Sequence, residues 1–287
     1  MNSTTTPKTV TTLASLRREV AAARGEGRRV GFVPTMGALH EGHLSLVRAC
    51  KAECDLAVVS IFVNPTQFGP GEDLDRYLRT LEADVARLTE CGANLVFAPS
   101  DDQVYRPGHD TWVEVDKLSR RWEGECRPTH FRGVTTVVLK LLNMVGPDVA
   151  CFGQKDYQQA ALIRRMVADL DVTVEIRVCP TVREPDGLAM SSRNAYLSPE
   201  ARRRAVVLWK SLCLARELVA SGQRDARVVA ARMRETVLSA DDARIDYIAL
   251  ADPDTLEPVE RVVGPTLAAV AATIENTRLI DNELLLP

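Results

Sequence analysis

The chain has 287 residues, of which 46% are hydrophobic and 26% are charged, and its net charge at pH 7 is −3. This composition suffices for a packed core and excludes global disorder, while the small net charge disfavours a nucleic-acid binder, which normally carries a basic face. The seven cysteines lack the spacing of a disulfide framework or a zinc site, and no apolar run is long enough to span a membrane, so we expect a soluble, cytoplasmic protein with reduced thiols.

The first 180 residues alternate between two kinds of hydrophobic pattern. Residues 1–9 show neither pattern and are expected to be frayed, and residues 100–131 are expected to be irregular. Helices are predicted over residues 13–24, from the turn at 43 to about 54, over most of 73–90, and over 132–145 and 157–170. Strands are predicted over residues 30–33, 56–63, 95–98, 149–152 and 172–178. This alternation predicts an α/β fold with a parallel, doubly wound sheet of the Rossmann-like kind.

The pattern changes after Arg193. Ser198 followed by Pro199 predicts a helix N-terminus, and two helices should extend to about residue 238. Short strands are predicted near 244–250 and 266–274, which gives an α+β pattern. We therefore predict two domains, a Rossmann-like domain at residues 1–181 and a smaller α+β domain at residues 182–287.

One turn between a strand and a helix is the first candidate site. Val30–Val33 is typical of a buried strand, Gly37 and Gly42 break the chain after it, and an amphipathic helix follows. Such a turn would offer backbone N–H groups and a helix N-terminus to an anion. His40 and His43 would lie on one side of the first helical turn, where they could donate to a triphosphate or, if protonated, offset charge at its α-phosphate. The alternative is an ordinary βα connection with polar loop histidines, since the glycine spacing matches no standard nucleotide motif.

Four further segments carry polar groups at predicted loops. Lys155 and Asp156 could bind a phosphate and either a ribose hydroxyl or a hydrated metal ion. Met190–Arg193 supplies two hydroxyls and a guanidinium, which suit a polyphosphate. Arg127–Gly133 gathers two arginines and a histidine, and Asn64–Phe68 offers two amides. Taken singly, these segments are also compatible, in the same order, with a solvated turn, a serine-rich hinge, a surface charge cluster and a β-turn.

Together, five motifs in this order resemble the pantoate–β-alanine ligase family of the nucleotidyltransferase α/β superfamily. The motifs are PTMGALHEGH (34–43), SIFVNPTQF (60–68), RPTHFRGV (127–134), FGQKDYQQ (152–159) and MSSRNAYLS (190–198). The resemblance extends from about residue 10 to the segment ending at Asp281. The chain departs from the family pattern at Leu78, Thr129 and Gln154, where the family usually has Pro, Gly and Glu.

The resemblance implies an ATP-dependent acid–amino-acid ligase that forms AMP. In such an enzyme the pantoate carboxylate attacks the ATP α-phosphate to give pantoyl adenylate and pyrophosphate. The amine of β-alanine then attacks the acyl carbon to give pantothenate, a precursor of coenzyme A, and AMP. The resemblance also implies Mg²⁺ as the partner of ATP, with no protein ligand for the metal identified, and a homodimer that binds neither nucleic acid nor membrane.

The resemblance assigns site residues to three groups. The catalytic residues are His40, His43, Lys155 and Arg193. The ATP-binding residues are Met36, Gly37, Ala38, Leu39, His40, Glu41, Gly42, His43, Gly153, Gln154, Lys155, Asp156, Val182, Met190, Ser191, Ser192 and Arg193. The residues for pantoate and β-alanine are Asn64, Gln67, His130 and Gln159.

Two other functions share part of this pattern. An adenylyltransferase would use the same histidine turn but would need neither the paired glutamines nor an amine acceptor. A nucleotide-binding regulatory module would bind ATP without turnover, which the intact His43 and Lys155 disfavour. Release of pyrophosphate, and release of AMP that depends on both pantoate and β-alanine, would separate the three.

Overall fold

The computed structural model describes residues 5–287, so the prediction for residues 1–4 lies outside the described part. The chain divides into two compact units. The first unit runs through Gly153 and includes Gln159–Pro180, and the second consists of Gln154–Gln158 and Thr181–Pro287. The predicted boundary had left residues 154–158 in the first domain, whereas their contacts group them with the second unit.

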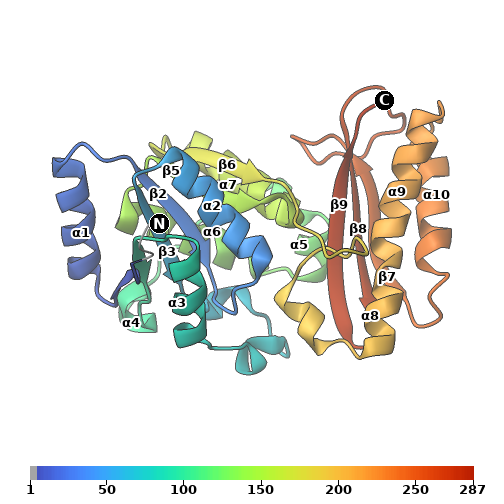
Figure 1. The fold of residues 1–287 in the computed structure, drawn as a ribbon. Helices are drawn as coiled ribbons and strands as arrows, with labels where there is room; N and C mark the ends of the chain where they lie inside the picture. Colours follow the sequence, from blue (N-terminus) through green and yellow to red (C-terminus); the bar gives the residue numbers. More distant parts are fainter. Residues whose placement is uncertain (1–4) are drawn as a thin grey trace. The chain divides into compact units, whose positions relative to one another are not determined.

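A six-stranded parallel sheet forms the centre of the first unit (Figure 1). Its strands are β1 (Lys8–Val10), β2 (Val30–Thr35), β3 (Leu56–Ile61), β4 (Leu95–Phe97), β5 (Val149–Gly153) and β6 (Glu175–Cys179). Their order across the sheet is β1-β4-β3-β2-β5-β6. Five of these strands were predicted. The expectation that the chain is frayed through residue 9 was wrong for Lys8 and Thr9, which pair with β4 in β1; three residues are too few to establish a period.

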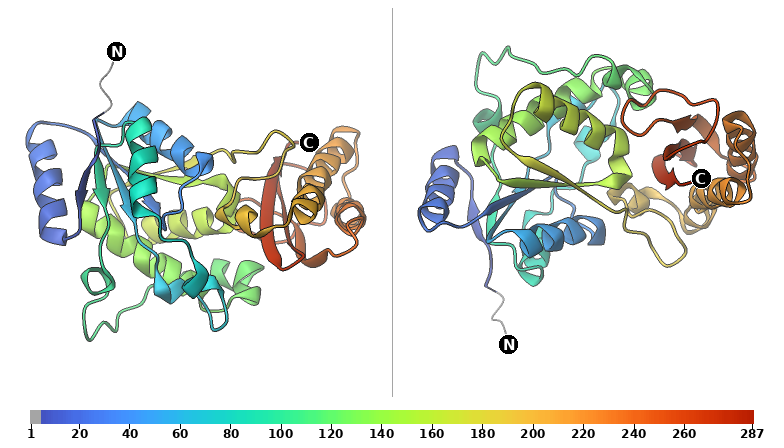
Figure 2. Two further views of the ribbon diagram at one scale, coloured as in Figure 1. Left: turned by 60° about the horizontal axis from the view of Figure 1, so that its bottom comes forward. Right: turned by 90° about the horizontal axis from the view of Figure 1, so that it is seen from above.

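Helices cover both faces of this sheet, as the right panel of Figure 2 shows for α2 and α6. The longer helices are α1 (Leu13–Gly25), α2 (Glu41–Glu53), α3 (Leu81–Glu90), α6 (His130–Val145) and α7 (Tyr157–Asp169). Side chains alternate along β2, so Val30 and Phe32 pack with α1 and α6 while Val33 packs with α2. The doubly wound α/β fold predicted from the sequence is therefore confirmed.

The sheet has a switch point between β2 and β5. The chain moves from β2 through β3 to β4 on one side, and then crosses to β5 and β6 on the other side. Loops that leave neighbouring strands in opposite directions open a crevice at the carboxyl edge, which is where open α/β sheets bind ligands. The turn that carries His40 and His43 follows β2 directly.

The second unit is a three-stranded antiparallel sheet with helices on one face (Figure 1). Its strands, in order across the sheet, are β7 (Arg244–Ala251), β8 (Thr266–Ile274) and β9 (Thr277–Leu285). Its helices are α8 (Pro199–Ala205), α9 (Val207–Ala220) and α10 (Ala226–Val237). Ser198 caps α8 through the backbone N–H of Ala201, as its sequence predicted.

Three predictions of secondary structure were incomplete. The stretch predicted as two helices holds three, because the chain turns at Val206 between α8 and α9. Residues 73–90 hold a short 3₁₀ helix at Asp73–Arg76 and then α3, so only the second half is α-helical. The irregular region 100–131 contains two four-residue helices, α4 (Asp101–Val104) and α5 (Glu123–Cys126), and a 3₁₀ turn at Leu118–Arg120.

No helix within residues 5–287 combines the length and the apolar character required to cross a bilayer.

Candidate active site

The turn from Met36 to His43, here called the histidine turn, is fixed by a buried carboxylate from α3. Asp84 is 1% exposed, and its two oxygens accept the backbone N–H groups of Ala38 at 3.0 Å and Leu39 at 2.8 Å. Gly37 and Ala38 both have positive φ, at 84° and 50°, and the second value is unusual for a residue with a side chain. Asp84 thus holds a backbone conformation that the turn would not favour by itself.

His40 and His43 cap the N-terminus of α2 reciprocally. The Nδ1 atom of His40 accepts the backbone N–H of Gly42 at 3.2 Å, and that of His43 accepts the N–H of His40 at 3.3 Å. The ring centroids lie 4.1 Å apart. Because each Nδ1 is an acceptor, the proton of each neutral ring lies on Nε2, which is the nitrogen not used in the cap.

The histidine turn therefore differs from its prediction in one respect. Every backbone N–H from Gly37 to His43, apart from that of Glu41, donates to an acceptor within the chain. We had expected these N–H groups to bind the anion. The structure commits all but that of Glu41 to Thr35, Asp84 and the two histidines, so hydrogen bonds from this turn to a ligand would come mainly from side chains.

A second cluster follows β3, on the 3₁₀ turn Pro65–Gln67. Asn64 is 1% exposed, and its Nδ2 donates to Gln67 Oε1 at 3.0 Å and to the carbonyl of Gly133 at 3.2 Å. Its Oδ1 accepts the hydroxyl of Tyr105 at 2.8 Å. Gln67 Nε2 lies 3.1 Å from the sulfur of Met36, so this cluster adjoins the histidine turn within the first unit.

His130 and Arg127 hold the backbone of Gln67, and Glu72 holds Arg127. His130 Nδ1 donates to the Gln67 carbonyl at 2.9 Å, Arg127 donates to the same oxygen at 3.3 Å, and Glu72 accepts from Arg127 Nε at 2.8 Å. Burial lowers the pKa of His130 to about 4, and the charge of Arg127 adds to the decrease. Burial raises the pKa of Glu72, but the hydrogen bond and charge of Arg127 outweigh it and leave the pKa below its usual value.

The role of His130 changes as a result. We had predicted a direct contact of this residue with substrate. The structure commits Nδ1 to Gln67 and brings Nε2 within 3.2 Å of Arg127 Nη1, so both ring nitrogens are used within the chain. In the structure His130 therefore positions Gln67, and its direct contact with substrate stays a prediction.

Gly133 lets α6 approach this cluster closely. A Cβ atom at this position would lie 2.4 Å from the carbonyl oxygen of Thr66 and 2.7 Å from the backbone nitrogen of Gln67. Both atoms belong to backbone, which cannot move aside as a side-chain end can. The glycine of the motif RPTHFRGV therefore sets the position of the Gln67 backbone.

The remaining predicted residues lie mostly in the second unit. Gln154, Lys155 and Asp156 form a 3₁₀ turn, here called the lysine segment, and the Lys155 ammonium lies 3.8 Å from the Asp156 carboxylate. Met190 donates its backbone N–H to the carbonyl of Val182 at 3.0 Å. Ser191 caps the turn that contains Ser192 and Arg193. Gln159 is half-buried in the first turn of α7, in the first unit, and Gly153 is the last residue of β5.

Several residues of these networks were not predicted. Asp84, Tyr105 and Asn282 contact candidate residues from far along the chain. Glu72 pairs with Arg127 in the first unit, and Asp281 pairs with Arg183 in the second. A buried polar residue within an apolar pattern was the only available signal, as at Asp84 on the apolar face of α3 and at Asp281 on the inward face of β9.

Comparison with known proteins identifies the family. A model of the family described as pantoate-beta-alanine ligase matches residues 8–284. Pantothenate synthetase from Moorella thermoacetica is 53% identical over 274 residues, which is 96% of this chain and 97% of the relative. A crystal structure of pantothenate synthetase from Thermus thermophilus matches with a TM-score of 0.93 and 47% identity, over 98% of this chain and 100% of that one.

A second solved structure carries bound molecules. It is that of pantoate-beta-alanine ligase from Francisella tularensis, complexed with beta-gamma ATP and beta-alanine. It matches with a TM-score of 0.79 and 33% identity, over 97% of each chain.

The doubly wound sheet, with polar side chains gathered after β2 and β3, defines an α/β fold, and the matches to the family model and its relatives define an ATP-dependent ligase. Within that class the family model spans almost all of the described residues and the M. thermoacetica relative exceeds half identity. The chain belongs to the pantoate–β-alanine ligase family.

Proposed function

We propose that the chain joins pantoate and β-alanine in two steps through a pantoyl adenylate. In the first, a carboxylate oxygen of pantoate bonds to the α-phosphorus of ATP and the bond to pyrophosphate breaks. In the second, the β-alanine amine bonds to the acyl carbon, the bond to AMP breaks, and the amine loses a proton. The product is pantothenate, and the family membership of the chain supports this overall reaction.

The observation that carries the proposal is the pair of histidines that cap α2. Their caps place the proton of each neutral ring on Nε2, so both rings present an N–H donor on one helical turn, 4.1 Å apart between ring centroids. Donors that are fixed before the reaction stabilise charge that develops in the transition state, and they need no reorganisation when it forms. We assign His40 and His43 to the ATP phosphates, as hydrogen-bond donors through Nε2.

The other assignments follow the chemistry of each group. Lys155, Ser191, Ser192 and Arg193 of the second unit are proposed to bind the phosphates, and Met36–Gly42, Gly153, Gln154, Asp156, Val182 and Met190 to frame the nucleotide. Asn64, Gln67 and Gln159 are proposed to bind pantoate, since neutral amides can hold its hydroxyls without reducing the nucleophilicity of its carboxylate. The F. tularensis relative, complexed with beta-gamma ATP and beta-alanine, supports the nucleotide and the amine as substrates.

Mg²⁺ is proposed to arrive with ATP. Among the described residues, no three His, Cys, Asp or Glu side chains gather into a metal site. Mg²⁺ usually keeps its waters and binds through substrate phosphates and one or two carboxylates. Asp156, with 48% of its side chain exposed beside Lys155, is the candidate carboxylate. When bound, the ion would neutralise charge on the phosphates.

A product assay tests the proposal. With ATP and pantoate alone, the protein should release about one equivalent of pyrophosphate and retain the adenylate. AMP and pantothenate should then appear in equal amounts only when β-alanine is added. Pyrophosphate release that does not depend on pantoate, or AMP transfer to a phosphorylated acceptor, would contradict the ligase and favour an adenylyltransferase. We further propose that the protein is a homodimer and that it lies in the cytoplasm. Sedimentation of the purified protein would test the dimer.

A further inference from the structure

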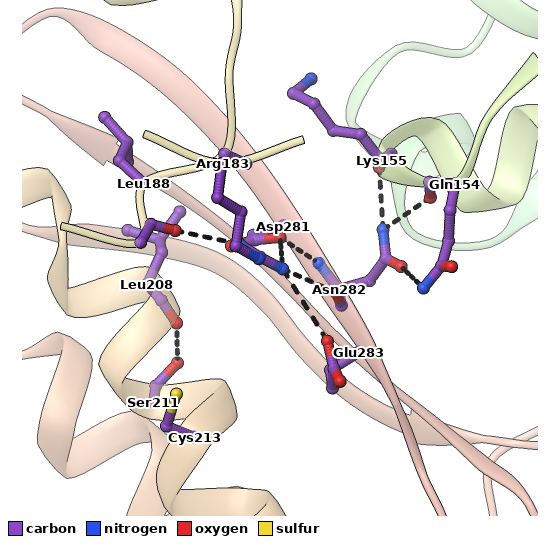
Figure 3. Close-up of polar contacts among 12 residues, drawn as sticks. Gln154, Lys155, Arg183, Leu188, Leu208, Ser211, Cys213, Asp281, Asn282 and Glu283 are labelled. Atoms are coloured by element: carbon purple, nitrogen blue, oxygen red, sulfur yellow. Dashed lines mark hydrogen bonds and ion pairs between the residues drawn. The ribbon is translucent and has the colours of Figure 1, made fainter. Parts of the chain in front are cut away.

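A buried side chain on the edge strand β9 holds the lysine segment. Asn282 is 2% exposed, and its Nδ2 donates to two consecutive backbone carbonyls, those of Gln154 at 3.0 Å and Lys155 at 2.8 Å (Figure 3). Its Oδ1 lies 3.5 Å from Nε2 of Gln154. The whole carboxamide of Asn282 is therefore used to fix these two residues.

The neighbouring residue, Asp281, points to the opposite face of β9, as successive strand residues do. It is 3% exposed and pairs with Arg183 through both oxygens, at 2.6 and 3.0 Å. Arg183 also donates to the carbonyl of Gly187 at 3.2 Å, and its guanidinium carbon lies 3.6 Å from the ring centroid of Trp209. Arg183 forms an isolated bridge with Ala189, which directly precedes the Met190–Arg193 loop.

Two adjacent residues of β9 thus anchor both proposed ATP-binding segments of the second unit. In Figure 3 the Lys155 side chain extends away from Asn282, so the bonds of Asn282 fix the backbone and leave the ammonium end outside this network. A lysine carries its charge at the end of a flexible side chain. Fixing its backbone therefore places the Cα atom but not the ammonium group. The placement of that Cα limits where the ammonium can reach.

We propose that Asn282 is a positioning residue for Lys155. It acts through the two carbonyls and makes no contact with ATP itself. The inference rests on the proposed function, because it gives Asn282 a role only if Lys155 binds the nucleotide. Asparagine suits the site because it supplies a donor where two carbonyl oxygens converge, whereas a carboxylate would repel both of them.

A double-mutant cycle tests the inference. Asn282→Asp keeps the shape of the side chain and replaces the donor by an acceptor. We expect it to slow pyrophosphate release from ATP and pantoate by about 10- to 100-fold, the scale of a small misplacement of a reacting group. In a Lys155→Ala background the same change should cost less than about 3-fold, because coupled residues are non-additive. Turnover of preformed pantoyl adenylate with β-alanine should change little in Asn282→Asp.

The control is Asn276→Asp, which makes the same chemical change at an exposed position in the turn between β8 and β9. It should leave every rate unchanged. If Asn282→Asp melts well below the wild type, Asn282→Ala takes its place in the cycle, since it removes the donor without burying a carboxylate. Equal losses with and without Lys155, or a wild-type rate in a folded Asn282 variant, would overturn the inference. A wild-type rate in Lys155→Ala alone would instead overturn the proposed role of Lys155.

Discussion

The histidine turn and the lysine segment are held by contacts of opposite kind and different range. In the first unit a carboxylate, Asp84, accepts two backbone N–H groups, and the histidines cap one another within four residues. In the second unit an amide, Asn282, donates to two backbone carbonyls from 127 and 128 residues away. Both devices fix the backbone by its own hydrogen-bonding groups and leave the side chains of the segment to meet a ligand.

Because the two segments are held differently, substitutions should impair them in different ways. The cap of α2 is local, and a change at His43 affects both the cap and the donor. The anchor of the lysine segment lies on another element, so it can be removed without touching the residue it positions. Variants are therefore most informative when they remove either the contact that fixes the backbone or the side chain that meets the ligand, and not both.

The largest effect is expected at His43. His43→Ala should slow adenylate formation by about 10²- to 10³-fold, the scale for removing a fixed charge-stabilising donor. His43→Gln should restore the stability of α2, because glutamine at this position completes a capping box, but should leave the rate low. Thermal melts and single-turnover pyrophosphate release measure the two effects. Recovery of the rate in the glutamine variant would mean that the reaction does not need an imidazole at this position.

A pH-dependent loss of stability is expected from His130. Its pKa falls from 6.5 to about 4 in the folded state, so the unfolded chain binds more protons between these values and stability decreases as the pH falls from 6.5 to 4. The full loss, reached below pH 4, is about 3 kcal/mol at 1.36 kcal/mol per pH unit. His130→Asn keeps a donor near the Gln67 carbonyl and does not titrate. Urea unfolding at several pH values should show a shallower decline for this variant, and equal slopes would contradict the prediction.

A smaller effect is expected where α6 packs against the 3₁₀ turn Pro65–Gln67. Gly133→Ala places a methyl group 2.4 Å from the Thr66 carbonyl oxygen and should destabilise the fold by about 1–3 kcal/mol. Gly25→Ala is the matched control, because a Cβ at the end of α1 meets nothing within 4 Å. Chemical denaturation compares the two. Equal stability would show that α6 can shift without cost, and the KM for pantoate should then be unchanged.

The smallest effect is expected from the proposed pantoate amides. Gln67→Leu or Gln159→Leu should weaken pantoate binding by about 0.5–1.5 kcal/mol, the usual value of a hydrogen bond between neutral groups. ATP affinity should be retained in both variants. Titration calorimetry with ATP and then pantoate separates the two affinities. Unchanged pantoate affinity in both, or weaker ATP binding in either, would place the acid pocket elsewhere.

Sequence patterns predicted what depends on neighbours along the chain. The helix at α1, the strand at β2 and the shared face of His40 and His43 all follow from local spacing, and the structure contains each of them. β9 was missed because two buried polar residues, Asp281 and Asn282, interrupt its apolar alternation. A buried polar residue usually has a hydrogen-bond partner, but only the folded structure shows which residue that partner is. Asp84 was not predicted for the same reason, because its partners lie 45 and 46 residues away.

The position of Asn282 in the chain also has a consequence for synthesis. Asn282 follows Lys155 by 127 residues, so at about 5–20 residues per second a ribosome makes the anchor about 6–25 s after the lysine. The strands of the first unit are all made by Cys179, and they can pair while β9 does not yet exist. A nascent chain would therefore complete its histidine turn well before its lysine segment is set. Full nucleotide binding would begin only after the last strand has been made.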